Sequence, residues 1–266
     1  MASYRARSQG RNTFSAALDR AQIRAHRDGS TRCCRANVRA PFHKLRVTGD
    51  LRPANALVYE SLNSAVLDTI PSSARRVLDI GCGAGTMGAW LKEHRDCSVT
   101  GVTHSAEEAE RAARRLDQVV LADLDHFEAD ALGSFDCVLC SHVLEHLVEP
   151  RSLLAKLRPL ISSDGSLVVA LPNVLFWRQR LAFLGGRFEY SDGGIMDRTH
   201  LRFFDWHSAA RLIEDSGFAI ERRDATGSLP GSRRLGGAVS RRLDALALAW
   251  APGLFGFQFV FRAMPA

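Results

Sequence analysis

The sequence predicts an α/β fold built on a doubly wound sheet of seven strands, most of them parallel. Short apolar runs typical of buried strands alternate with stretches of helical periodicity, and connections of that length normally join parallel strands. Glycines at positions 81, 83 and 85 follow the first of these runs, where a strand is expected to turn into a helix. With 266 residues, 46% of them apolar, the chain can bury the core of such a domain.

The expected elements follow one another in regular order. The strands cover residues 76–80, 98–103, 118–122, 135–140, 166–171, 218–222 and 255–261. The helices cover residues 55–70, 86–94, 105–115, 150–158, 206–215 and 238–250. Their ends carry ordinary signals: a capping box from Ser105 to Glu108, Pro150 at a helix start and Gly217 at a helix end.

The last expected strand has phenylalanine at every second position from Phe255 to Phe261, which predicts one buried aromatic face. It follows a helical stretch and comes next to another strand in sequence. We therefore expect an antiparallel pair at the sheet edge, with the C-terminal strand as the antiparallel edge strand. A longer segment, residues 172–204, interrupts the alternation and is interpreted as an insert.

Residues 1–50 differ from the rest of the chain, because they hold 11 Lys and Arg against 3 Asp and Glu and show no periodicity. We interpret them as a basic, mobile or loosely docked extension, and residues 51–266 as the domain. The chain holds 32 Arg and only 3 Lys, so a general arginine bias explains this charge, and no nucleic-acid partner is expected. An organellar transit peptide is the alternative for this segment.

Several classes of protein are excluded by composition. No apolar run reaches the length of a membrane span and no signal peptide is recognisable, so a cytoplasmic protein is expected. The six cysteines are expected to be free thiols. Cys137 and Cys140 have the spacing of a metal or redox pair, but in a strand they would point to opposite faces.

The segment from Asp79 to Gly85 has the properties of a cofactor loop. Its glycines allow the chain to approach a ligand closely at the start of a helix. A dinucleotide is the rival ligand, since residues 83–88 satisfy G-x-G-x-x-G. The second strand, however, ends in Thr103 and His104 rather than in an acid, and no Tyr-xxx-Lys pair exists. A carboxylate before the glycines suits the cationic amino group of an amino-acid-derived cofactor.

At these residues the chain resembles the class I S-adenosylmethionine-dependent methyltransferases. The segment 77–85 is similar to their motif V-L-D-x-G-x-G-x-G, and the segment 135–146 to F-D-x-V-x5-L-E-H. The resemblance covers about residues 55–262 and implies a Rossmann-like sheet, S-adenosyl-L-methionine as cofactor, and Asp123 against adenine. Thr103 departs from the acid that most members place on the cofactor ribose. The expected cofactor-binding residues are Asp79, Gly81, Cys82, Gly83, Gly85, Thr103, His104, Asp123, Leu124, Ser141 and His142.

The segments 172–178 and 184–187, followed by His200, resemble the MetW-like, or methyltransferase-23-like, branch of this family. That resemblance implies that the insert closes over the cofactor and forms the acceptor pocket. Methyl transfer to oxygen or nitrogen requires removal of a proton, and histidine is the natural base near neutral pH. His200 is the expected catalytic base and His146 the second candidate.

A metal site is the alternative for the same region. Glu145, His146 and His200 resemble part of the ligand set of metal-dependent RNA and quinone-precursor methyltransferases, which carry Glu-xx-Glu-His. Here the first Glu is replaced by His142, so the oxygen ligands that a hard cation prefers are incomplete, and no metal is expected.

The expected function is therefore methyl transfer from S-adenosylmethionine to a small polar acceptor. O-methylation of a sugar, phenol, carboxylate or other biosynthetic intermediate fits best. Two alternatives remain open: a regulatory MetW-like partner protein that binds the cofactor without turnover, and an RNA methyltransferase that uses the basic N-terminal arm. Oligomeric state does not follow from the sequence.

Overall fold

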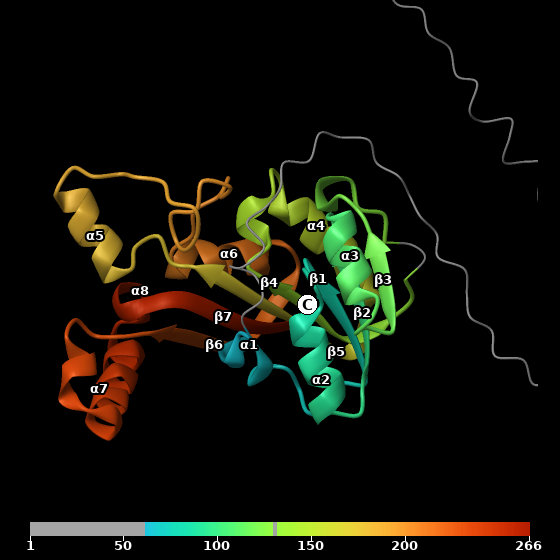
Figure 1. The fold of residues 1–266 in the computed structure, drawn as a ribbon, viewed down its shortest axis with the longest axis horizontal. Helices are drawn as coiled ribbons and strands as arrows, with labels where there is room; N and C mark the ends of the chain where they lie inside the picture. Colours follow the sequence, from blue (N-terminus) through green and yellow to red (C-terminus); the bar gives the residue numbers. More distant parts are fainter. Residues whose placement is uncertain (1–61, 130–131) are drawn as a thin grey trace, which may run out of the picture. The chain divides into compact units, whose positions relative to one another are not determined.

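The computed structural model describes residues 62–129 and 132–266, and its centre is a seven-stranded sheet (Figure 1). The strands are β1 (Arg76–Ile80), β2 (Ser98–Thr103), β3 (Gln118–Leu121), β4 (Phe135–Ser141), β5 (Ile161–Pro172), β6 (Phe218–Gly227) and β7 (Gly256–Pro265). The α-helices are α1 (Ser64–Leu67), α2 (Thr86–His94), α3 (Ala106–Ala112), α4 (Pro150–Leu157), α5 (Trp177–Leu184), α6 (Trp206–Asp215), α7 (Gly237–Trp250) and α8 (Pro252–Phe255). Short 3-10 turns are η1 (Leu124–His126), η2 (Leu144–His146), η3 (Arg158–Leu160) and η4 (Ser232–Leu235).

The strand order is β3-β2-β1-β4-β5-β7-β6, and the first five strands pair in parallel. β7 is antiparallel to both of its neighbours, as expected for the C-terminal strand. Its expected position at the edge is wrong, because β7 lies between β5 and β6, and β6 is the outer strand. Phe261 and Val260 of β7 are buried on opposite faces, whereas several residues of β6 are exposed, and this difference fits an inner β7 and an outer β6.

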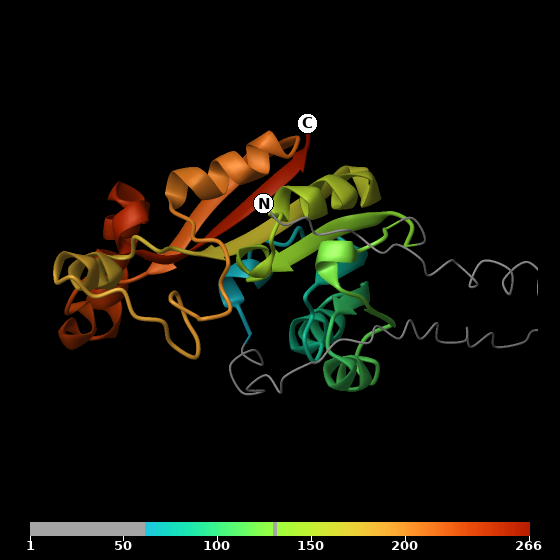
Figure 2. The ribbon, with the colours of Figure 1, turned by 90° about the horizontal axis from the view of Figure 1, so that it is seen from above.

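Helices cover both faces of the sheet, which confirms the doubly wound fold. Buried residues of α4 and α6 share one core with the sheet, and those of α1, α2 and α3 share the other. Figure 2 shows these two groups of helices on opposite sides of the strands. Cys140 belongs to the first core and Cys137 to the second, so the two thiols point apart as predicted.

Many strands and helices lie close to the predicted ranges, but α5 within the insert was not predicted. β6 continues to Gly227, past the predicted 222, and β7 continues to Pro265, because these two strands pair with each other over this length. β5 begins at Ile161, before the predicted 166, because Ile161 pairs with Phe135 ahead of an irregularity in the β4 register. Phe255 ends α8 rather than starting a strand, and Phe257 is 42% exposed, so the buried aromatic face is limited to Phe259 and Phe261.

Two predictions fall wholly or partly outside the described residues. These are the basic extension at residues 1–50 and the helix at 55–70. Within residues 62–70 the structure has only the four-residue α1, which begins after its N-cap Asn63, so the prediction of a continuous helix there is wrong. Cys33 and Cys34 also lie outside them, whereas the four cysteines within the described ranges are free. None of the helices in residues 62–129 and 132–266 combines the length and apolar character that crossing a bilayer requires.

Candidate active site

The glycine loop lies where β1 ends and α2 begins. Backbone N–H groups of Gly81 and Cys82 both donate to the carbonyl of Val102, at 2.8 and 2.9 Å, which ties the loop to β2. Gly81, Gly83 and Gly85 all have positive φ. A Cβ on Gly81 would lie 2.4 Å from a methyl group of Val143, so this position requires glycine for space as well as for conformation.

Asp79 is a buried carboxyl group one residue before the end of β1. Its side chain is only 2% exposed, and Oδ2 has no hydrogen-bond partner among the described residues. Burial raises the pKa of Asp79 to about 7. A cationic amino group at this position would give the orphaned oxygen its missing partner, so the residues present fit the amino-acid end of S-adenosylmethionine.

Cys82 is placed differently from its neighbours in the loop. Its thiol packs in the core, where a Cβ added to Gly101 would lie 2.6 Å from the Cys82 sulfur. Burial raises the pKa of this thiol, so it stays protonated. Only the backbone of Cys82 is therefore available to a ligand, and its place in the cofactor site remains a prediction.

Glu108, predicted only as part of a capping box, lies beside the end of β2. Thr103 is 2% exposed, and its hydroxyl donates to Oε2 of Glu108 at 2.7 Å. Glu108 Oε1 lies 4.0 Å from where a Cβ on Gly83 would stand. A carboxylate from the first turn of α3 thus lies beside the end of β2 and near the glycine loop.

The predicted capping box at this helix is only half formed. Ser105 Oγ accepts from the backbone N–H of Glu108, but the N–H of Ser105 donates to Thr103 Oγ1 instead of to the Glu108 side chain. The Glu108 carboxylate is thereby free to turn toward the glycine loop. A complete capping box occurs instead at α6, between Asp205 and Ser208.

Two more predicted residues, Asp123 and Leu124, follow the end of β3. The Asp123 carboxylate accepts from the backbone N–H of Asp125 and pairs with His126, both at 3.1 Å, and so caps η1. The hydrogen bond from His126 holds the pKa of Asp123 below its ordinary value, and His104 is near enough to add to this effect. Leu124 packs partly against the core. Contacts of these residues with adenine or ribose remain predictions.

His142, directly after Ser141 at the end of β4, has a strained backbone. Among the described residues other than glycine it alone has a positive φ, of 56°. Its ring bridges Gln258 on β7, at 2.6 Å from Nε2, and Glu145, at 3.1 Å from Nδ1. Burial opposes a charge there, but the hydrogen bonds and the charge of Glu145 hold the pKa of His142 above its ordinary value.

This bridge was not foreseen, because Gln258 lies 116 positions away in the chain. Gln258 is 9% exposed and exchanges two amide hydrogen bonds with Asn63, just before α1. The only sequence signal was a polar side chain inside an aromatic strand. His142 therefore lies in a partly buried polar network, and its assignment to the cofactor remains a prediction.

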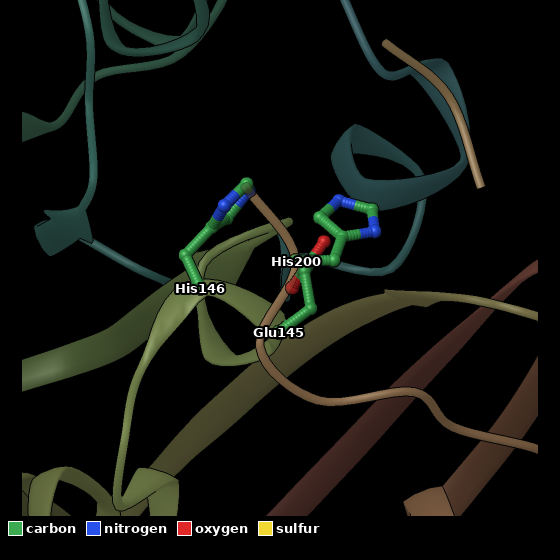
Figure 3. A group of neighbouring side chains, drawn as sticks. All are labelled: Glu145, His146 and His200. Atoms are coloured by element: carbon green, nitrogen blue, oxygen red, sulfur yellow. The ribbon is translucent and has the colours of Figure 1, made fainter. Parts of the chain in front are cut away.

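Glu145, His146 and His200, the residues of the alternative metal site, lie together in the structure (Figure 3). Backbone N–H groups of Leu201 and Arg202 donate to the Glu145 carbonyl at 2.8 and 3.0 Å, which fastens the returning end of the insert to η2. The rings of His146 and His200 meet edge to face, with centroids 4.8 Å apart. Glu145 is fully buried, and its Oε2 has no partner within the described part of the chain.

Hydrogen bonds fix which ring nitrogen of each histidine is available. His200 Nδ1 lies 3.0 Å from the Ile195 carbonyl, to which it can only donate, so Nε2 carries the lone pair of the neutral ring. Burial lowers the pKa of His200, against the opposing charge of Glu145. His146 Nδ1 contacts the carbonyl and hydroxyl of Thr199, at 3.3 and 3.1 Å, and its Nε2 is available in the same way.

This arrangement suits two kinds of chemistry. Neutral His200 with a free Nε2 can accept a proton, and the negative charge of Glu145 would stabilise the imidazolium that results. One ligand atom from each of the three residues lies within 4.8 Å of the others, so the group has the compactness of a metal site as well. The predicted absence of a metal remains a prediction.

A cavity of about 550 Å³ lies between the insert and the adjoining ends of β6 and β7. Its walls include Phe176, Ile195 and Met196 from the insert and Thr226 and Phe257 from the strands. Ile195 accepts the His200 hydrogen bond, and Phe257 precedes Gln258, so the cavity wall is joined directly to the buried polar groups. Its size suits a small organic acceptor.

Comparison with known proteins shows that the chain is similar to methyltransferases. Residues 52–222 match the family model described as a methyltransferase domain. A ubiquinone biosynthesis O-methyltransferase from Xanthomonas axonopodis pv. citri is 28% identical over 213 residues, covering 76% of this chain and 86% of that protein. O-methyltransferase cnsE from Penicillium expansum is 32% identical over 107 residues, covering 38% of this chain and 39% of that protein.

A SAM-dependent methyltransferase structure from Archaeoglobus fulgidus has a TM-score of 0.55 at 20% identity, covering 74% of this chain and 89% of that chain. At 20% identity, this structural similarity is evidence for the fold only. The chain spans only 28% to 39% of the length of several curated relatives that it matches. The family model, in contrast, covers more than half of this chain. The chain thus belongs to the methyltransferase domain family of class I methyltransferases, in which S-adenosylmethionine is the methyl donor.

Proposed function

We propose that this protein methylates an oxygen atom of a small polar acceptor, with His200 as the base. The observation that carries the proposal is the buried His200 ring, whose Nδ1 donates to the Ile195 carbonyl, so that Nε2 of the neutral ring is left to accept a proton within the compact group that includes Glu145. Oxygen acceptors must lose a proton as the methyl group arrives, and a positioned neutral histidine takes it. The O-methyltransferases among the similar proteins are consistent with this choice.

The chain's own residues have distinct parts in the reaction. S-adenosylmethionine supplies an electrophilic methyl group when bound. Asp79 would pair with its amino group, and backbone N–H groups of the glycine loop would line its other polar atoms. The cavity beside the insert would hold the acceptor, and Glu145 would stabilise the protonated His200 until the proton leaves to solvent.

The experiment is a transfer assay with purified full-length protein, S-adenosylmethionine and a panel of phenols, sugars, carboxylates and amines. We expect formation of S-adenosylhomocysteine together with a methyl ether or ester, identified by mass spectrometry. Methylation confined to amines would contradict the oxygen assignment. Cofactor binding without transfer to any acceptor, combined with a stable protein partner, would favour the regulatory alternative.

Glu108 should bind the ribose hydroxyls of the cofactor in place of the acid missing from β2. We expect Glu108→Gln to weaken S-adenosylmethionine binding about 10- to 100-fold, since hydrogen bonds to a charged group contribute about 1.5–3 kcal/mol. Isothermal titration calorimetry measures the change. Glu107→Gln is the matched control, because its carboxylate is one residue away on the same helix and 82% exposed. Unchanged affinity in Glu108→Gln would limit Glu108 to ordering Thr103.

A further inference from the structure

One end of the domain exposes a stripe of large apolar side chains along α7. Val239, Leu246 and Trp250 follow one another at intervals of seven and four residues, which places them on one side of the helix. They are 53%, 68% and 81% exposed. Single exposed apolar residues are ordinary, but an aligned row ending in tryptophan indicates a surface that meets something apolar.

A second exposed apolar group lies on the insert. Leu181 and Leu184 of α5 are 60% and 85% exposed, and Phe188 and Tyr190 beyond the helix are also exposed. Figures 1 and 2 both place α5 and α7 at the same end of the domain, away from α2 and α3. These two groups of exposed apolar side chains form the apical surface, which consists of Val239, Leu246 and Trp250 on α7 and Leu181, Leu184, Phe188 and Tyr190 on the insert.

Positive charge gathers at this same end. Residues 177–190 and 231–250 hold seven arginines against two acidic residues. The rest of the chain from residue 51 onward holds 17 Lys and Arg against 24 Asp and Glu. Arg241 and Arg242 are exposed on α7, as are Arg178 and Arg187 on the insert. The apical surface is thus apolar and basic, on a domain that is otherwise acidic.

We propose that the apical surface docks on an anionic lipid bilayer. Leucine and aromatic side chains enter the boundary between headgroups and acyl chains, while arginines extend to the lipid phosphates. A second copy of the chain fits this surface less well, because two apical surfaces would bring their arginines together. The docking is peripheral, in keeping with the absence of a membrane-spanning helix from the described residues.

Docking would also bring the acceptor cavity to the lipid. Arg178 and Gln179 of α5 line the cavity of about 550 Å³, so its wall is continuous with the apical surface. An acceptor carried in the membrane would then reach the cavity from the headgroup layer. This consequence rests on the proposed function, whereas the docking itself does not.

Flotation of the full-length protein with vesicles tests the docking. We expect binding to vesicles of phosphatidylcholine with phosphatidylglycerol and little binding to phosphatidylcholine alone. The double variant Leu246→Ser, Trp250→Ser should bind at least about tenfold more weakly, because each buried side chain contributes transfer free energy. Arg241→Gln, Arg242→Gln should bind more weakly and with less dependence on salt. Leu62→Ser and Arg114→Gln, exposed positions outside the apical surface, are the controls.

Tryptophan fluorescence provides an independent readout, since Trp250 is one of only four tryptophans. We expect a blue shift on addition of anionic vesicles that is lost in Trp250→Phe. Vesicle binding that all apical variants retain would overturn the proposal and assign the binding to another part of the chain. A dimer that Leu246→Ser dissociates, without vesicle binding, would also overturn it. These variants should still transfer methyl groups to a soluble acceptor. A failure of the docking proposal is thereby distinguished from a failure of the proposed function.

Discussion

Asp79→Asn should weaken binding of S-adenosylmethionine at least about 100-fold and, at the same time, raise the melting temperature of the cofactor-free protein. In the complex the variant would lose the proposed ion pair with the cofactor's amino group, and loss of one member of a buried charge pair costs about 3–5 kcal/mol. In the free protein it removes a buried carboxylate whose Oδ2 has no partner among the described residues. Titration calorimetry and thermal unfolding measure the two opposite effects.

The pH dependence of both quantities follows from the pKa of about 7 for Asp79. Between its ordinary value of 3.8 and about 7 the folded protein holds a proton that the unfolded chain releases. Stability of the cofactor-free protein should therefore fall as pH rises through this window. Affinity for the cofactor should rise with pH up to about 7, because only the ionised carboxylate pairs with the amino group.

Asp79→Asn should abolish these two pH dependences, and Asp96→Asn, at an exposed carboxylate, should leave them intact. Wild-type affinity of Asp79→Asn for S-adenosylmethionine would contradict the assignment of Asp79 to cofactor binding. A melting temperature below that of the wild type would show instead that the carboxylate has a partner that stabilises the free protein.

His200→Ala should lower turnover by about 100- to 10,000-fold, the range typical of a lost general base, and leave cofactor affinity within about twofold. The side chain is 8% exposed and receives no expected contact from the cofactor. Because burial holds the pKa of His200 below 6.5, turnover should rise with pH through a value below 6.5 and then remain flat near neutrality. Single-turnover kinetics across this pH range would measure both effects.

His207→Ala, at an exposed histidine of α6, is the control and should keep full activity. A fall in cofactor affinity without a fall in turnover would give His200 a structural part. Treatment with a chelator tests the alternative that these residues form a metal site. Activity that disappears on chelation and returns with a divalent metal would make Glu145, His146 and His200 ligands, and would contradict both the proposed base and the expected absence of metal.

The sequence by itself determined the fold class and the position of the cofactor loop. Both depend on local signals: apolar runs that alternate with helical periodicity, and glycines where β1 must turn sharply into α2. Helices α2 and α6 and strand β2 have the predicted bounds. Asp79 was identifiable for the same reason, because its place before the glycines puts it at the end of a buried strand.

Tertiary structure alone decided the contacts between distant parts of the chain. Gln258 reaches His142 because β7 pairs directly with β5, the neighbour of β4, and His142 follows β4. The Glu108 carboxylate accepts from Thr103 because the Ser105 N–H donates to Thr103 instead of to Glu108. Helix propensity does not distinguish these two hydrogen-bond patterns. The free nitrogen of His200 likewise depends on the carbonyl of Ile195, which the folded insert places beside it. Local periodicity fixes strands and loops, whereas hydrogen bonds between remote segments fix the chemistry of the site.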